Sequence, residues 1–260
     1  MKFLCPLLAA AGVLSLVSPS HAAVTYSNGT YNQTFDTLSG VGVWANDSTL
    51  AGWFAATQFT PNITAIGSNT GTTTAAGLYS FGVNATNPLA ERSFGFAPSN
   101  AFTGASGTGQ GYLGLNLTNS NSWALDSFTL SYDGEQWRKE NNASVHTLVV
   151  QYSLDATSLT TGTWTNLGGS STFSSPIAAA TTAAALDGNA SANRVAGLSG
   201  TASSLNWAAG TSLWIRFVDL NDTGNDHLLA IDNVNFSAVP EPSAALIGAI
   251  GLLGLLRRRR

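Results

Sequence analysis

Cysteine and charge are the two features that this 260-residue chain has least of. Its single cysteine, Cys5, lies in an apolar leader, so the rest of the chain holds no disulfide and no cysteine-ligated metal. Charged residues make up only 9% of the chain, whereas an ordinary soluble domain has roughly 25%. Residues 23–238 contain 5 basic and 13 acidic groups. Because nucleic-acid binding requires Lys and Arg against the phosphates, this deficit argues against a nucleic-acid partner.

Helical periodicity and internal repeats are also missing from residues 23–238. Apolar and polar residues instead alternate with a period of two at 113–117, 128–132, 148–152 and 213–217, which is typical of strands. Clusters of Gly, Asn, Thr and Ser separate these segments. We therefore predict an all-β fold, a single antiparallel β-sandwich of jelly-roll-like type. Weaker strand candidates lie at 31–35, 53–59, 78–83, 93–96, 163–167 and 229–236, and the Ala-rich segment 177–186 could form one helical turn.

The first 22 residues have the composition of a secretory signal peptide. Lys2 gives a positive start, residues 3–17 form an apolar run, and the polar segment 18–22 ends it with small residues at the cleavage positions. We expect a signal helix that signal peptidase removes before Ala23. A buried first helix is the alternative, but the Ser-Pro-Ser exit fits it poorly.

Two closely spaced prolines mark the other end of the domain, because they fit neither a helix interior nor a central strand. After Val239, the motif Pro240-Glu241-Pro242 precedes an apolar run at 243–256. As a helix this run would be about 21 Å long, shorter than the roughly 30 Å hydrocarbon core, so it inserts only if flanking arginines reach the headgroups. A buried amphipathic helix is the alternative, but the run has no polar face. The basic cluster Arg257, Arg258, Arg259 and Arg260 then predicts a short transmembrane helix with a cytoplasmic C-terminus.

The tail at 239–260 resembles the PEP-CTERM sorting signal in its motif, its short apolar stretch and its terminal basic cluster. The resemblance implies a Gram-negative bacterium and processing by an exosortase, a membrane-embedded thiol protease. It further implies export, transient anchoring in the inner membrane, and release to the cell surface or the extracellular polysaccharide matrix.

A series of short segments in the domain resembles a secreted bacterial β-sandwich module found with sorting tails and, elsewhere, beside lamin-tail or nuclease domains. No reaction is assigned to that module, so the resemblance implies fold and location rather than activity. The segments that carry it are 132–138 (Tyr-Asp-Gly-Glu-Gln-Trp-Arg), 151–153, 161–164, 186–194, 214–219 and 230–233.

Candidate catalytic residues are few. His146 and His227 are far apart in sequence, lack a nearby His or Cys, and are expected at the surface or in turns. The segment Gly104-Ala-Ser106-Gly-Thr does not have the spacing of a nucleophile elbow. A glycoside hydrolase needs two facing carboxylates, but Glu135 precedes Trp137 and Arg138 in a segment where a guanidinium would pair with it. We therefore predict no catalytic residues and no enzymatic activity.

Seven tryptophans are many for this length. They could form an aromatic platform for sugars, or they could fill a large core that has no disulfides, because each Trp buries about 150–250 Å². Core packing is favoured overall. Trp214 is expected inside, and Trp44, followed by Ala45-Asn46-Asp47, is the one expected at the surface.

Oxygen-bearing side chains crowd the segment that follows the strand candidate at 213–218. Asp219, Asn221, Asp222 and Asp226 lie within eight residues, and no Lys or Arg is among them. Such a set suits Ca²⁺, which takes about 6–8 oxygen ligands. The spacing is not that of an EF-hand.

The alternative for this segment is a hairpin loop whose Asp and Asn side chains cap their own backbone. Gly224 would then supply a positive φ, and Asp232 could pair with Arg216 across neighbouring strands. Both interpretations remain open at this stage.

The sequence as a whole predicts an exported surface or matrix protein with a structural or adhesive role. A carbohydrate-binding module, with extracellular polysaccharide as its partner, is the first alternative, and a polysaccharide hydrolase is the less favoured one. An exposed row of Trp or Tyr would favour binding, and a cleft with two facing carboxylates would favour hydrolysis.

Overall fold

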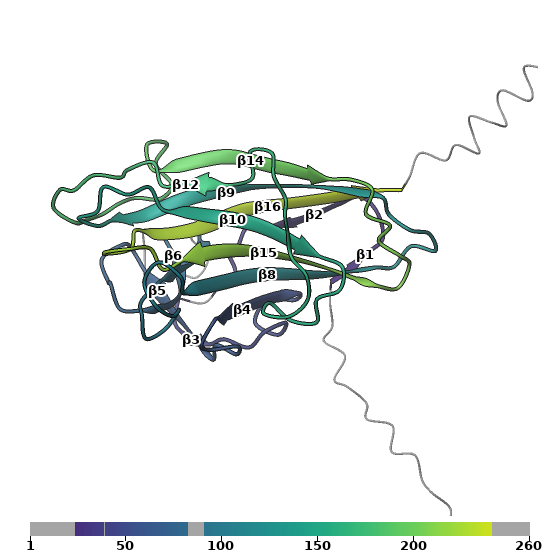
Figure 1. The fold of residues 1–260 in the computed structure, drawn as a ribbon, viewed down its shortest axis with the longest axis horizontal. Coiled ribbons are helices and arrows are strands. Elements are labelled where there is room, and N and C mark those ends of the chain that lie inside the picture. Colours follow the sequence, from purple (N-terminus) through teal and green to yellow (C-terminus); the bar gives the residue numbers. More distant parts are fainter. Residues whose placement is uncertain (1–23, 39, 83–90, 241–260) are drawn as a thin grey trace, which may run out of the picture.

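The computed structural model describes residues 24–38, 40–82 and 91–240, and among these it contains strands and no helix (Figure 1). The predicted all-β class is therefore confirmed. Within these ranges, accordingly, nothing has the length and apolarity of a membrane-spanning helix. The leader, Glu241, Pro242, the apolar run and the arginine cluster lie outside the described residues, so those predictions stay predictions.

The smaller sheet, sheet A, has seven strands in the order β1-β8-β15-β10-β11. β4 pairs with β8 beside β1, and β12 pairs with β10 beside β11. The central pair is antiparallel, with Ser212 opposite Thr118 and Leu220 opposite Gln110. The strands are β1 (Val24–Tyr26), β4 (Trp53–Thr57), β8 (Gln110–Asn119), β10 (Thr147–Ser153), β11 (Thr165–Asn166), β12 (Phe173–Ser174) and β15 (Ser212–Leu220).

The larger sheet, sheet B, has nine strands in the order β13-β9-β16-β7-β6-β5-β3. β14 also pairs with β9, and β2 also pairs with β16. Its longest strands, β9 and β16, pair with each other. The strands are β2 (Thr30–Gln33), β3 (Gly42–Val43), β5 (Ala65–Asn69), β6 (Gly77–Phe81), β7 (Ser93–Ala97), β9 (Ser127–Lys139), β13 (Ala184–Ala185), β14 (Arg194–Ala202) and β16 (Leu228–Val239).

The main core lies between the two sheets and is built by the predicted period-two alternation. Phe217 of β15 meets Tyr132 of β9, with ring centroids 4.9 Å apart. Trp53 of β4 packs edge-on against Phe94 of β7. Aromatic residues thus carry much of the apolar burial that a disulfide-free domain needs. The fully buried large side chains include Trp44, Trp53, Trp137, Trp207, Tyr132, Phe35, Phe81, Phe94, Phe96, Phe128 and Phe173.

Three local expectations differ from the structure. Two strand pairs are parallel rather than antiparallel, β1 with β8 and β5 with β6. β14 was not anticipated, because its many Gly, Ser, Thr and Ala residues give no clear alternation. The Ala-rich segment 177–186 forms no helical turn, and its Ala184–Ala185 instead adds an edge strand beside β9.

The two ends of the described domain leave from the same end of the sandwich. The Tyr26 hydroxyl accepts a hydrogen bond from Ala238 N at 2.7 Å, which connects β1 to the C-terminal end of β16. The loop at 221–227 lies at the opposite end, where β15 finishes and β16 begins (Figure 1).

Candidate cation site and adjoining groove

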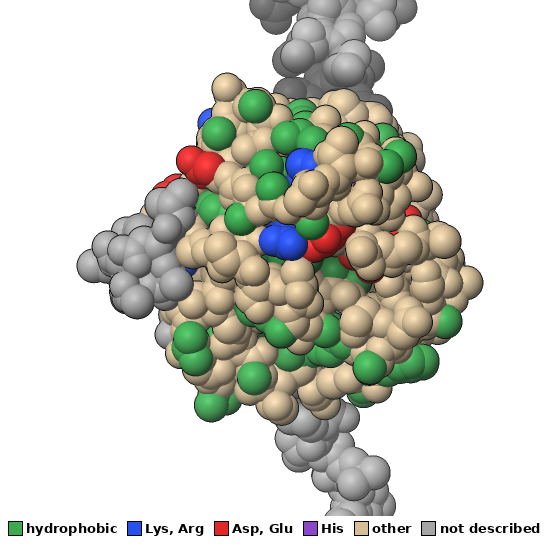
Figure 2. Space-filling view, turned by 90° about the vertical axis from the view of Figure 1, so that its left-hand side faces the viewer, with side chains coloured by type: hydrophobic (Ala, Val, Ile, Leu, Met, Phe, Trp, Pro, Cys, Tyr) green, Lys and Arg blue, Asp and Glu red, His purple; other side chains and the backbone are tan. Residues whose placement is uncertain are grey.

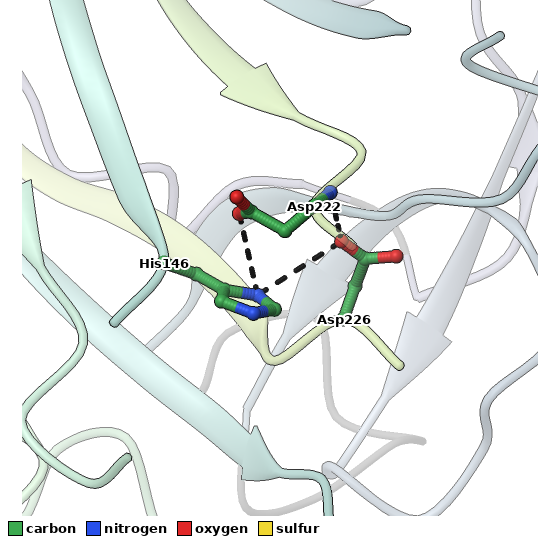
Figure 3. Close-up of side chains that lie close together, drawn as sticks. All are labelled: His146, Asp222 and Asp226. Carbon is green, nitrogen blue, oxygen red and sulfur yellow. Dashed lines mark hydrogen bonds and ion pairs between the residues drawn. The ribbon is translucent and has the colours of Figure 1, made fainter. Parts of the chain in front are cut away.

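The loop at 221–227 brings two of the predicted carboxylates to a histidine from another part of the chain. His146 lies one residue before β10, which pairs with β15, and so it reaches the same end of sheet A. Its Nδ1 is 3.4 Å from Asp222 Oδ2 and 3.9 Å from Asp226 Oδ1 (Figure 3). Sequence analysis did not connect His146 with this loop, because only the pairing of β10 with β15 brings them together.

The loop has the hairpin features of the alternative interpretation. Asp222 N donates a hydrogen bond to Asp226 Oδ1 at 2.7 Å, and Gly224 adopts a φ of 98°. From outside the loop, Asn142 donates to the carbonyl oxygens of Thr223 and Asn225, both at 3.0 Å. Backbone capping therefore fixes the loop shape.

Capping does not satisfy all the carboxylate oxygens. Asp222 Oδ2 and Asp219 Oδ2 are buried atoms without a hydrogen-bond partner among the described residues. Burial, together with the charges of Asp226 and Asp222, raises the pKa of Asp219 well above its usual range. Burial also raises the pKa of Asp226 to about 7. Buried acceptors of this kind are costly unless a proton or a cation compensates them.

The predicted ligand set is only partly assembled. Asn221 is buried, and its Nδ2 donates to Asn100 Oδ1 and to the Gly104 carbonyl, so this side chain fastens the loop to residues 100–104. His146 adds a ring nitrogen, but its Nδ1 already accepts a hydrogen bond from His227 N at 3.1 Å. Oxygens of Asp222 and Asp226 lie together beside His146, and Asp219 is a buried acidic neighbour whose charge both of them affect. Carboxylate oxygens of this kind fit a hard cation such as Ca²⁺.

Both histidines are buried, which corrects the expectation that they lie at the surface or in exposed turns. Each is 1% exposed, and their rings lie 4.4 Å apart. His227 Nδ1 accepts a hydrogen bond from Glu140 N. Burial and the neighbouring His227 lower the pKa of His146 to about 4. His146 is therefore neutral near pH 7 and does not offset the charge of the two aspartates.

A groove of about 700 Å³ borders the loop. Uncharged polar side chains line much of it, among them Thr74, Ser99, Asn100 and Asn225, together with Asp226. The ion pair of Arg138 with Glu140 also lies in its wall. Figure 2 shows this end of the sandwich, where basic and acidic side chains meet at a hollow in a mostly uncharged polar surface.

Two further side-chain expectations require correction. Glu135 does not pair with an arginine: Arg138 pairs with Glu140, while Glu135 Oε2 accepts a hydrogen bond from Trp137 Nε1 at 2.9 Å. Asp232 cannot pair with Arg216, because the two lie in different sheets. Arg216 instead binds Gln151 Oε1 and stacks over Trp164 and Tyr112.

The tryptophans pack largely as the core interpretation expects, with one local error. Trp44 is 1% exposed, not exposed as predicted, because its ring packs on Phe94 and its Nε1 donates to Asn46 Oδ1. Trp214 is buried as expected, although in a smaller cluster on the outer face of sheet A. Trp123, at 48%, is the only exposed tryptophan, and all seven lie in the described residues. The tryptophans thus form no exposed row.

The chain matches no family model and no curated protein. Among solved structures, it is similar to the CBM22-1 xylan-binding domain of Paenibacillus barcinonensis Xyn10C, with 11% identity, a TM-score of 0.38, and 82% and 97% of the two chains covered. It is also similar to the mannan-recognising carbohydrate-binding module TmCBM27, with 11% identity, a TM-score of 0.35, and 80% and 95% covered. The active domain of bacteriophage CBA120 tailspike protein 4 gives 14% identity and a TM-score of 0.36, with 77% and 21% covered. Similarity at this level identifies neither a family nor a function.

Proposed function

We propose that the chain is an exported, jelly-roll-like protein of the cell surface or extracellular matrix, with an adhesive, non-catalytic role. The polar groove carries this proposal. Its hydroxyl, amide and ion-paired side chains are the groups that hydrogen-bond a hydroxyl-rich polymer, and we infer that its partner is an extracellular polysaccharide. The resemblance of the tail to a PEP-CTERM signal supports delivery to the place where such a polymer is found.

Calcium is proposed as a structural partner of the same region. Asp226 lines the groove and belongs to the carboxylate group of the adjoining loop, so a cation bound there would hold one wall of the groove in place. Binding of the polymer is therefore expected to be stronger in the presence of Ca²⁺.

A hydrolytic role is disfavoured by the arrangement of the carboxylates that do meet. Oxygens of Glu91, Glu135 and Asp232 lie within 4.8 Å of one another. Glycosidases hold their two carboxyl groups about 5–5.5 Å or about 6.5–9.5 Å apart, on either side of the bond that breaks. Glu135 and Asp232 are 0% and 1% exposed, so no sugar ring fits between them.

Retention of the purified chain on immobilised polysaccharides, or on a glycan array, tests the proposal. Thr74→Val and Asn225→Ala each remove a polar group from the groove and should weaken binding roughly two- to tenfold, the effect of one lost hydrogen bond. Trp123→Ala is the matched control, because Trp123 lies near Asn119 at the other end of the sandwich. Loss of binding in Trp123→Ala alone would locate the site at that exposed aromatic residue instead.

The same polysaccharides test the non-catalytic part of the proposal. We expect no release of reducing ends by the wild-type chain. Hydrolysis that disappears in Glu135→Gln or in His227→Ala would overturn it.

A further inference from the structure

A second group of carboxylates lies on the outer face of sheet B, away from the loop at 221–227. Glu135 belongs to β9, Asp232 to β16, and Glu91 comes two residues before β7. Asp232 stands opposite Asp133 in the register of β16 with β9, and Ala230 stands opposite Glu135. Because side chains two apart on a strand share a face, these positions bring Asp133, Glu135 and Asp232 to the same surface of the sheet.

The segments that resemble the secreted module meet at this place. Asp133 and Glu135 come from 132–138, Asn189 and Arg194 from 186–194, and Asp232 from 230–233. Glu91, Asp232, Asn189 and Arg194 together line a cavity of about 350 Å³, with Asp36 and Asn233 completing its wall. Neither the groove nor the core explains why acidic residues collect here.

Each buried carboxylate of this cluster has one satisfied and one unsatisfied oxygen. Glu135 Oε2 accepts from Trp137 Nε1, and Asp232 Oδ2 accepts from Asn233 Nδ2 at 2.9 Å. Glu135 Oε1 and Asp232 Oδ1 are buried and have no hydrogen-bond partner among the described residues. The Asn189 amide oxygen, in the wall of the same cavity, is a third buried acceptor without a partner.

Nearby basic groups do not balance the negative charge. Arg194 Nη1 is 3.9 Å from Asp133 Oδ2, and its charge also acts on Glu135, so this one guanidinium faces two carboxylates. Arg92 follows Glu91 and attracts it, and residues 83–90 contain no Lys or Arg.

We propose that Glu91, Glu135 and Asp232, with the amide oxygen of Asn189, form a calcium-binding site that is separate from the loop at 221–227. Ca²⁺ accepts oxygen ligands at about 2.3–2.6 Å, so two of its ligands can be up to about 5 Å apart, whereas Mg²⁺ at about 2.1 Å requires closer spacing. The oxygens of Glu91, Glu135 and Asp232 lie within 4.8 Å of one another, inside the span that Ca²⁺ ligands allow. Water in the cavity supplies the remaining ligands. The ion joins β9, β16, the segment before β7 and the loop before β14 at one point.

Terbium luminescence tests the site directly. Tb³⁺ occupies oxygen sites built for Ca²⁺, and the Trp137 indole, hydrogen-bonded to Glu135, lies close enough to sensitise it. The full chain, purified in detergent and freed of metal, should show saturable Tb³⁺ emission on tryptophan excitation, and Ca²⁺ should displace it. Asp232→Asn and Glu91→Gln should each weaken Ca²⁺ competition roughly tenfold or more, as expected for loss of a ligand charge.

Two variants make the outcome decisive. Glu91 is exposed, so Glu91→Gln keeps the fold even if Asp232→Asn does not. The Asp222→Asn/Asp226→Asn variant removes Tb³⁺ binding at the loop at 221–227, so saturable emission that remains in it belongs to the second site. In this background Asp232→Asn or Glu91→Gln should abolish the remaining emission. Absent emission in the Asp222→Asn/Asp226→Asn variant, or emission there that persists when Asp232→Asn and Glu91→Gln are added, would each overturn the proposal.

Discussion

Asn221 illustrates how one buried amide can hold a functional loop without binding a ligand. Its Nδ2 donates to Asn100 Oδ1 at 2.9 Å and to the Gly104 carbonyl. The backbone carbonyl of Asn221 accepts a hydrogen bond from Gly107 N. These bonds join the loop at 221–227 to residues 100–107 beneath the groove. The composition of the segment suggested a metal ligand, because a sequence shows which side chains carry oxygens and not which way they point.

Replacement of Asn221 should therefore destabilise the fold directly. Asn221→Ala leaves the buried Gly104 carbonyl oxygen unpaired and removes the hydrogen bond to Asn100, at an expected cost of about 1–3 kcal/mol in the free energy of unfolding. Asn225→Ala, in the same loop but exposed, should change it by less than about 0.5 kcal/mol. Urea unfolding of both variants gives the comparison, and equal midpoints would refute the role of Asn221.

At the residue scale, the sequence predicted whether a side chain is buried only where its neighbours along the chain determine this. Trp214 was correctly expected inside, because its own strand is apolar on both faces. Trp44 was not, because the polar residues after it bind its Nε1 and the backbone instead of drawing the ring into water. The contact of His146 with His227 depends on strand pairing across 81 residues, which no local pattern encodes.

Strands were the most predictable elements. Where two strands lie unusually close together, glycine makes the close contact possible. The four clear alternating segments fall in β8, β9, β10 and β15, where one face is buried in the core. β14 escaped prediction because its small residues show no clear alternation, and the parallel pairs escaped it because strand order depends on contacts between distant segments. Gly95 of β7 shows what this packing demands: a Cβ there would overlap the Leu229 carbonyl oxygen and approach the Ala230 Cβ to 2.8 Å.

Gly95→Ala should accordingly separate β7 from β16. We expect a loss of about 1–3 kcal/mol in the free energy of unfolding, the range for overpacking of a close contact. Gly77→Ala in β6 is the matched control, because its added Cβ would meet only the Tyr79 ring, at 3.5 Å. Thermal unfolding of both variants in parallel measures the difference, and a Gly95→Ala variant as stable as Gly77→Ala would contradict it.

At the scale of the whole molecule, acidic residues without basic partners make the fold dependent on its ionic surroundings. Asp219 at the end of β15 forms one acidic group with Asp222 and Asp226 of the loop at 221–227, and Glu91, Glu135 and Asp232 on the outer face of sheet B form another. A chain without disulfides has no covalent crosslink to offset this repulsion, and either bound protons or bound cations can reduce it.

Calcium should therefore raise the melting temperature. At a concentration about 100 times the Kd, selective binding to the folded state adds about 2.7 kcal/mol, or roughly 5–10 °C for a domain of this size. In the Asp222→Asn/Asp226→Asn variant, the gain from the loop should disappear and the total increase should be smaller. Calorimetry with calcium and with a chelator is the measurement. Identical curves in the wild type, or an equal gain in the variant, would leave these carboxylates as a solvated hairpin.

Processing at both ends is the second prediction at this scale. Intact-mass analysis of protein recovered from the cell surface should show a start near Ala23 and loss of residues 243–260. Replacement of Pro240-Glu241-Pro242 by alanines should leave the chain in the inner membrane, because the apolar run and the arginines remain. Recovery of the full-length C-terminus from the extracellular fraction would contradict the sorting proposal.

Both ends of the domain leave from the side of the sandwich opposite the groove, so the length of the sandwich sets the distance between the groove and the point where the tail is attached. β16 starts at the loop end and runs for 12 residues to Val239, a span of about 40 Å at roughly 3.3 Å per residue. A chain held by the residues after Val239 would present its loops at 221–227 and 100–107 as the outermost surface, about 40 Å from the point of attachment. Cleavage at either end would then alter the tether and leave that outer surface intact.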